Sequence, residues 1–360
     1  MLYENFPPPH DKSKVVKQRE SNFELLRLVA ILLVLLTHAD FFALSGPNQT
    51  EINNQPIESV LRIFFQVISV VCVNIFVLIS GWFSIRPSKK GALNLLFQIL
   101  FYQIVVFITV VIFAGKPFNL MDVKHIFLFT SSHWFIKSYI FLFLLAPVLN
   151  SFVAHSSRKV FKFVLLAFFA YQTIYGWLLP SATNYIQGGY SPLSFIGLYL
   201  LARYLNVYKP TIIQKSVRWD MVMIFVIVIT VTALCVLPEW IGLPLNAVYA
   251  YNFLTYISPS TLFMSVLLLG LTSKIRITNC LVNSLAASSL AVYMVYVSPW
   301  LLTPYKEFFM YLYSKVHFLS YWAIVFCLLP IMYGLVAIID ILRKKSFNIL
   351  IKSLSNEENQ

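Results

Sequence analysis

The stretch ELLRLVAILLVLLTHAD, residues 24–40, is a run of apolar residues with an arginine near its start and a histidine near its end. It is long enough to form most of a membrane-spanning helix, because about 20 apolar residues cross the hydrocarbon core of a bilayer. Ionisable side chains inside such a helix are costly and often mark a functional site. Arg27 and His38 are therefore the first candidates for one.

The spacing of Arg27 and His38 fixes their relative directions on a helix. Eleven residues at about 100° each give about three turns and 20°, so both side chains point to one side of the helix. At about 1.5 Å per residue, they lie roughly 16 Å apart along its axis. The pattern predicts one helix face with a cation towards one end and an imidazole towards the other. Asp40 lies about 200° around the helix from His38, and we interpret it as an interfacial residue.

Two interpretations of this face remain open. In the first, the face lines a route for a ligand: Arg27 holds an anionic or carbonyl group, and His38 acts as a general base near neutral pH. In the second, Arg27 extends to the lipid headgroups and His38 makes a hydrogen bond between helices. Glu24 lies three residues before Arg27, where it is placed either to pair with the guanidinium or to stay solvated.

The composition indicates a polytopic membrane protein. Of the 360 residues, 59% are hydrophobic and 11% are charged, whereas about 25% of a soluble domain is charged. The mean hydropathy is +0.76. The net charge of +13 sits in short segments between apolar runs, so it indicates membrane topology and a lipid bilayer as partner, with no nucleic acid.

Ten apolar runs are long enough, or nearly so, to span a bilayer. The sequence therefore predicts an all-α polytopic membrane protein with about ten transmembrane helices. The runs are 23–44, 59–83, 92–114, 133–153, 161–180, 190–206, 219–238, 254–273, 285–304 and 319–342.

The distribution of lysine and arginine orients these helices. With the N-terminus inside, 20 of these residues fall in cytoplasmic segments and four in outer loops. Positive charge prefers the cytoplasmic side, so both termini are predicted to be cytoplasmic. We expect a multi-pass protein of the cell inner membrane, with a basic tail at 1–20, a transmembrane domain at 21–345 and a C-terminal tail at 346–360. The four cysteines form no C-x-x-C pair and are interpreted as packing residues, with no metal site.

Two groups of polar residues add candidate sites. Ser80 and Gly81 end the second run, where small residues allow helices to approach closely. The basic residues Arg86 and Lys89 follow. They either bind phosphates or only reflect the preference of positive charge for the cytoplasmic side of the membrane.

On the opposite side, Trp134 and Lys137 open the fourth run and Arg62 opens the second. Together they would form a polar patch with an aromatic surface that suits a sugar. Alternatively, Trp134 belongs to the aromatic belt at the membrane interface, and Lys137 extends to the membrane surface.

Several segments together resemble the acyltransferase-3 family of bacterial integral membrane acyltransferases. The resemblance covers nearly the whole chain in order, with the expected ten helices. It is carried by RLVAILLVLLTH (27–38), NIFVLISGWF (74–83), HWFIKSYIFLFLLAPVLN (133–150), SPLSFIGLYLLARYL (191–205) and LAASSLAVYMVY (285–296).

The resemblance implies transfer of an acyl group, usually acetyl, from cytoplasmic acyl-CoA to a hydroxyl of a surface or envelope glycan, such as exopolysaccharide, capsule or lipopolysaccharide. It implies functional roles for Arg27 and His38, with Arg86 and Lys89 closest to the family's basic pair. No permanently bound cofactor is expected, since acyl-CoA is a substrate. Tyr296 stands where the family often has histidine.

From these features we predict His38 and Arg27 as catalytic residues. Donor binding is assigned to Arg27, Ser80, Gly81, Arg86 and Lys89, and acceptor binding to Trp134, Lys137 and Arg62.

Two other classes of protein also have many apolar helices. A secondary transporter would show inverted repeats or midplane helices broken by Gly or Pro, and the sequence has no convincing pair of such segments. A glycan polymerase or export component would carry a large periplasmic loop, whereas no outer loop here exceeds about twenty residues.

Overall fold

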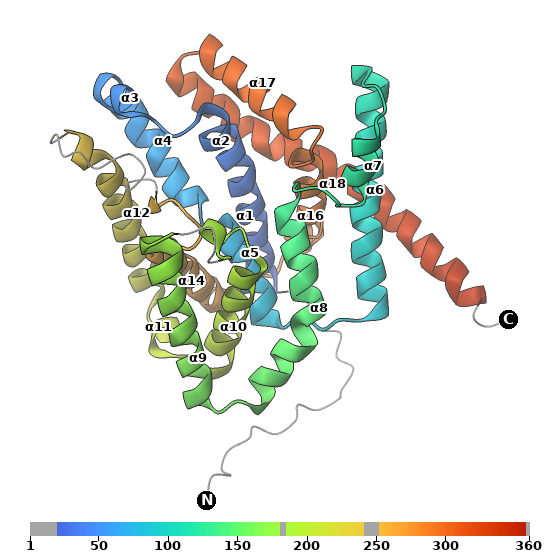
Figure 1. Ribbon diagram of the computed structural model, residues 1–360, viewed down its shortest axis with the longest axis horizontal. Helices are drawn as coiled ribbons and strands as arrows, with labels where there is room; N and C mark the ends of the chain where they lie inside the picture. Colours follow the sequence, from blue (N-terminus) through green and yellow to red (C-terminus); the bar gives the residue numbers. More distant parts are fainter. Residues whose placement is uncertain (1–19, 181–184, 241–251, 358–360) are drawn as a thin grey trace, which may run out of the picture.

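The computed structural model describes residues 20–180, 185–240 and 252–357, and in these ranges the protein is helical, with no strand (Figure 1). The all-α prediction is confirmed. All but one residue of the tail predicted at 1–20 lies outside the described ranges. The elements are α1 Ser21–Ala39, α2 Phe41–Leu44, α3 Gln49–Asn54, α4 Pro56–Ser69, α5 Cys72–Phe83, α6 Lys89–Ala114, α7 Leu120–Ile126, α8 Trp134–His155, α9 Arg158–Tyr171, the π-helical η1 Gln172–Leu178, the short η3 Gln187–Gly189, α10 Pro192–Tyr208, α11 Thr211–Gln214, α12 Val217–Trp240, α14 Pro259–Lys274, α15 Cys280–Ala286, α16 Ser289–Tyr296, α17 Leu302–Lys315 and α18 Phe318–Glu357.

Seven helical segments within the described ranges are long and apolar enough to cross a membrane. They are Ser21–Leu44, Pro56–Phe83, Lys89–Ala114, Trp134–His155, Arg158–Leu178, Val217–Pro238 and Phe318–Ile349. This supports a multi-pass membrane protein.

The other three predicted runs contain shorter helices. These are α10 with 17 residues, α14 with 16, and α16 with 8, which lies in the run 285–304 between the end of α15 and the start of α17. Proline is among the first residues of α10 and α14, where it is favoured because its missing N–H would have no partner. The count of ten and the cytoplasmic termini therefore remain predictions.

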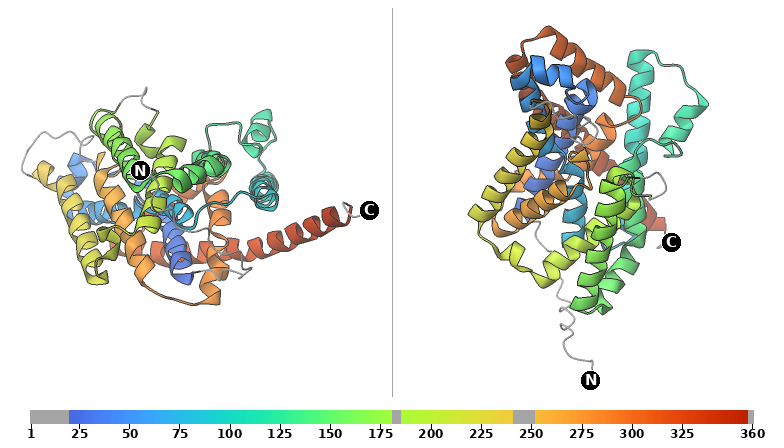
Figure 2. Two further views of the ribbon diagram at one scale, coloured as in Figure 1. Left: turned by 90° about the horizontal axis from the view of Figure 1, so that it is seen from below. Right: turned by 60° about the vertical axis from the view of Figure 1, so that its left-hand side comes forward.

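Helix α1 lies among helices from both halves of the chain, and one of its faces is fully buried. Ala30, Ile31 and Leu35 on this helix have no exposed surface. It packs against α4 and α5 and, from the end of the chain, against α14 to α18 (Figures 1 and 2). By contrast, the C-terminal part of α18 extends away from the bundle, past the predicted domain end at residue 345 (Figure 2). The opening stretch of sequence thus forms a central element of the fold.

A buried carboxylate joins three helical regions of the bundle. Asp340 of α18 is fully buried and accepts hydrogen bonds from Tyr102 Oη of α6 at 2.8 Å and from Ser288 Oγ, just before α16, at 2.7 Å. It also pairs with Arg343 Nε at 2.6 Å and Lys344 Nζ at 2.8 Å. We call these five residues the Asp340 cluster. Because every group in it has a partner, the cluster holds α6, α16 and α18 together.

Candidate functional site

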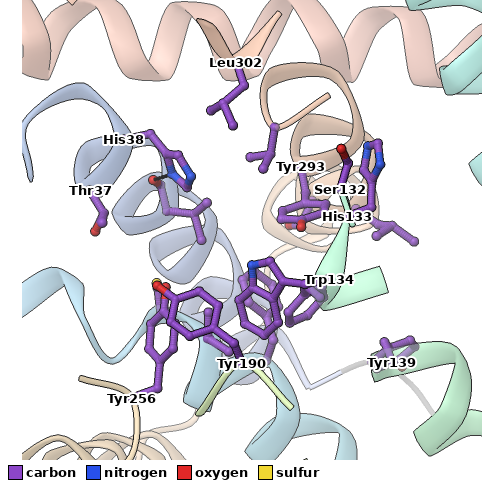
Figure 3. Close-up of a pocket in the computed structure, with 18 of the residues that line it drawn as sticks. Thr37, His38, Ser132, His133, Trp134, Tyr139, Tyr190, Tyr256, Tyr293 and Leu302 are labelled. Atoms are coloured by element: carbon purple, nitrogen blue, oxygen red, sulfur yellow. Dashed lines mark hydrogen bonds between the residues drawn. The ribbon is translucent and has the colours of Figure 1, made fainter. Parts of the chain in front are cut away.

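A cavity of about 520 Å³ lies between α1, α5, α8, α16 and α17 (Figure 3). Its size is within the range of about 300–1,000 Å³ typical of small-molecule sites. Both Arg27 and His38 line it. The structure therefore brings the two ionisable residues of the opening stretch to one cavity.

The cavity face of α1 follows from helical spacing. Arg27, Val34 and His38 lie seven and then four residues apart, which places them on one side of a helix. Thr37 also lines the cavity from α1 (Figure 3). The spacing that predicted a common direction for Arg27 and His38 is thus confirmed, since both side chains line the same cavity.

The imidazole of His38 is held by the helix that carries it. Its Nδ1 lies 2.8 Å from the carbonyl oxygen of Val34 (Figure 3). A carbonyl oxygen only accepts hydrogen bonds, so Nδ1 carries the hydrogen. In the neutral ring, Nε2 then has a free lone pair. The ring centroid lies 5.0 Å from that of Phe42. The geometry fixes both the tautomer and the orientation that a general base needs.

Arg27 is oriented by the carboxylate one turn earlier. Its Nη1 pairs with Glu24 Oε2, and its side chain is 28% exposed. The structure thus has the ion pair that the sequence left open. A guanidinium has five N–H donors, so Arg27 keeps donors for a ligand while Glu24 fixes its position.

Three aromatic rings form a wall of the cavity. Trp134 opens α8, and its ring centroid lies 4.5 Å from that of Tyr190 and 5.9 Å from that of Tyr256. The centroids of Tyr190 and Tyr256 are 5.0 Å apart. We call these three residues the aromatic wall (Figure 3). Trp134 was a predicted acceptor contact. The two tyrosines were missed because they lie outside regular helices, where no periodic pattern marks them.

Ser80 and Gly81, predicted together, have different surroundings. Ser80 lines the cavity and donates a 2.9 Å hydrogen bond to the carbonyl oxygen of Phe76. Gly81 faces α10: a Cβ at this position would lie 2.5 Å from the carbonyl oxygen of Tyr199 and 2.8 Å from Cβ of Ala202. Gly81 therefore allows α5 and α10 to approach, and the structure gives it no surface towards the cavity.

Arg62 is not part of the cavity lining. Its side chain is buried between α1 and α4, with Nε 2.8 Å from Asp40 Oδ1. It also donates to the carbonyl oxygen of Ser45 and lies over the ring of Tyr313. Asp40, which was interpreted as an interfacial residue, is 2% exposed and is the partner of Arg62 in this ion pair. Arg62 therefore joins α4 to the end of α1 and to the segment after α2, and its predicted contact with the acceptor stays a prediction.

The remaining predicted residues lie outside the cavity lining. Lys137 turns away, with Nζ 2.5 Å from the carbonyl oxygen of Thr130. Arg86 and Lys89 are exposed between α5 and the first residue of α6. Tyr296 donates a 3.0 Å hydrogen bond to the carbonyl oxygen of Met332. The position where a histidine was expected therefore serves the packing of α16 on α18.

Two further cavity residues were missed as site residues. His133 precedes α8 and is 3% exposed, with Nε2 2.8 Å from Nε2 of Gln103. Lys306 reaches the cavity from α17. His133 directly precedes Trp134 in the fourth run, and this adjacency was the available signal. In the sequence, Lys306 counted only as one of the four lysines in outer loops. Its neighbouring residues do not distinguish it from the other three.

The chain was compared with known proteins. The model of a family described as an acyltransferase domain, the acyltransferase-3 family, matches residues 20–341. No curated protein and no solved structure matches the chain.

Proposed function

The chain belongs to the acyltransferase-3 family, and on this premise we propose that it transfers an acyl group from cytoplasmic acyl-CoA to a hydroxyl of a cell-envelope or surface glycan. Acetyl is the proposed acyl group. The proposal includes ten membrane-spanning helices with both termini in the cytoplasm of a bacterial cell and the protein in its inner membrane. The observation that carries it is the single cavity lined by both Arg27 and His38.

The donor is proposed to enter from the side of Arg27. The phosphates of CoA stay near the basic inner ends of the helices, where Arg86 and Lys89 are exposed. The pantetheine arm extends along the cavity face of α1, and the free N–H groups of Arg27 hold a carbonyl or phosphate oxygen. Roughly 16 Å of helix separate Arg27 from His38, so the thioester reaches the imidazole while the nucleotide remains outside.

His38 is proposed to act through Nε2. This atom takes the proton from the acceptor hydroxyl as the oxygen attacks the thioester carbonyl. The C–S bond then breaks, and the CoA thiolate takes the proton from His38, giving the ester and CoA thiol. Alternatively, Nε2 attacks the thioester carbonyl first, the C–S bond breaks and CoA thiolate leaves. The acceptor hydroxyl then takes the acyl group from Nε2 and gives its proton to the thiolate. Both routes need the tautomer that the hydrogen bond to Val34 sets.

The acceptor sugar is proposed to lie against the aromatic wall. Sugar rings have apolar C–H faces, and Trp134, Tyr190 and Tyr256 offer large rigid apolar surfaces with polar edges. Ser80 and Thr37 add hydroxyl groups to the lining. Stacking on this wall would turn one sugar hydroxyl towards His38.

The test is to supply acetyl-CoA labelled in its acetyl group to membranes containing the full chain and to follow the label into glycan. His38→Gln is expected to lower the transfer rate by about 10²–10⁴-fold, the usual contribution of a general base. The matched control is His155→Gln, because His155 is an exposed histidine at the end of α8. Full transfer by His38→Gln would show that the catalytic assignment is wrong.

A further inference from the structure

The charge of the cavity lining is one-sided. Arg27 and Lys306 line it, and none of the described lining residues is an aspartate or a glutamate. Arg27 has its own counterion in Glu24. The lining therefore carries one positive charge that Glu24 balances, on Arg27, and a second one on Lys306.

Lys306 differs from three other half-buried lysines of the protein. Lys116 pairs with Asp122, Lys274 with Asp220, and Lys344 with Asp340. Lys306 takes part in none of the ion pairs within the described residues, which are Arg27–Glu24, Arg62–Asp40, Lys116–Asp122, Lys274–Asp220, Arg343–Asp340 and Lys344–Asp340. It is nevertheless half-buried and lines the cavity, and a charge held away from water is unfavourable without a counterion.

The position of Lys306 places it at the acceptor end of the cavity. Leu302 and Lys306 are four residues apart, so they lie on one face of α17, and both line the cavity. Figure 3 shows Leu302 and His38 at the same end of the cavity, beyond the aromatic wall. The charged part of CoA is proposed to lie at the other end, beside Arg27. An anion that meets Lys306 would therefore belong to the acceptor.

We propose that Lys306 binds an anionic group of the acceptor, a carboxylate or a phosphate, so that the enzyme acylates an acidic sugar. This inference rests on the proposed function, because it assigns the acceptor of the same cavity. The aromatic wall takes the sugar ring, and Lys306 fixes its orientation through the charge. Lys306 is thus a specificity-determining residue, and a charge-assisted hydrogen bond of this kind is stronger than one between neutral groups.

The binding test uses pairs of probes that differ only in charge. The full chain in lipid nanodiscs is titrated with p-nitrophenyl β-D-glucuronide and p-nitrophenyl β-D-glucoside for a carboxylate, and with glucose 6-phosphate and glucose for a phosphate. In at least one pair, the charged probe is expected to bind about tenfold more tightly, the scale of one hydrogen bond to a charged group. A carboxylate preference identifies an acidic sugar, and a phosphate preference identifies a phosphorylated one.

Matched variants assign this preference to one residue. Lys306→Gln should reduce it to about twofold or less, and Lys306→Arg should retain it. Lys315→Gln is the control, because it removes the same charge from an exposed position on the same helix. The proposal is overturned by equal affinity within both pairs, by no binding of any probe, or by a preference that Lys306→Gln leaves unchanged.

A transfer assay separates this inference from the proposed function. If Lys306→Gln lowers kcat equally with charged and neutral acceptors, Lys306 acts on the transition state, and the acceptor assignment is overturned. An increase in KM for charged acceptors alone supports it. If the wild type moves no label from acetyl-CoA to any acceptor, the proposed function fails, while the binding preference is decided by the titrations.

Discussion

The cavity and the Asp340 cluster are both polar regions inside an apolar bundle, and they differ in how their polar groups are satisfied. Asp340 has partners on both carboxylate oxygens, from α6, α18 and the residue before α16. In the cavity, Thr37 Oγ1 and His133 Nδ1 are buried and have no hydrogen-bond partner among the described residues. Lys306 likewise has no ion pair there. Satisfied networks stabilise a fold, whereas the unsatisfied groups around the cavity do not hold helices together.

The largest expected effect is on stability and comes from the Asp340 cluster. Asp340→Ala leaves Arg343, which is 3% exposed, as a buried charge without its carboxylate. Breaking a buried pair in this way costs about 3–5 kcal/mol, so we expect a large fall in melting temperature or in the yield of folded protein. The double variant Asp340→Leu with Arg343→Met should recover part of this loss. A stable Asp340→Ala single variant would remove the contrast between the two regions.

The next effect tests the contact between α5 and α10. Gly81→Ala places a methyl group against the carbonyl oxygen of Tyr199, and overpacking of this kind costs about 1–3 kcal/mol. The control is Gly334→Ala in α18, where a Cβ meets no atom within 4 Å and helix propensity favours alanine. The measurement is thermal unfolding of both variants. If Gly81→Ala is as stable as wild type but loses donor binding, the result supports the assignment of Gly81 to donor binding.

A smaller effect is expected at the aromatic wall, on acceptor binding. Trp134→Leu removes stacking worth about 0.5–1.5 kcal/mol, and the acceptor KM should rise roughly two- to twelvefold. The KM for acetyl-CoA should stay the same. Trp134→Phe retains an aromatic face and should lose less. Acceptor-dependent initial rates provide the measurement, and an equal change in both KM values would argue against a sugar on this wall.

The smallest effect is expected at Tyr296. Tyr296→Phe removes the hydrogen bond to the carbonyl oxygen of Met332, which contributes about 0.5–1.5 kcal/mol. We expect a slightly lower melting temperature and an unchanged transfer rate per folded molecule. A large loss of transfer without a change in stability would give this tyrosine a role in the reaction.

The sequence predicted best where information is local to one helix. The spacing of Arg27 and His38 depends only on helical geometry, and the common wall followed from it. The family resemblance was also correct, since it used several motifs in order. The ion pair of Arg62 with Asp40 was missed because its partners are 22 residues apart on different elements. Nothing in either local sequence identifies the other as its counterion.

The two tyrosines of the aromatic wall and Lys306 were missed for the same physical reason. Tyr190 precedes α10, Tyr256 precedes α14 and Lys306 lies on α17, so they meet only after the bundle has packed. The helix count stayed a prediction because hydropathy measures how apolar a run is, and it does not detect the break between α15 and α16 at Ala287 and Ser288.

The most direct test of the central claim separates donor binding from chemistry within the one cavity. For each purified protein, the melting temperature is measured with and without CoA, and the difference is compared between wild type and the variants. Saturating CoA should stabilise wild type and His38→Gln alike, by about 2.7 kcal/mol at 100 times Kd. The variant Glu24→Gln with Arg27→Met removes both charges of the ion pair and should lose this stabilisation. No stabilisation of the wild type, or equal stabilisation of all three proteins, would contradict the account.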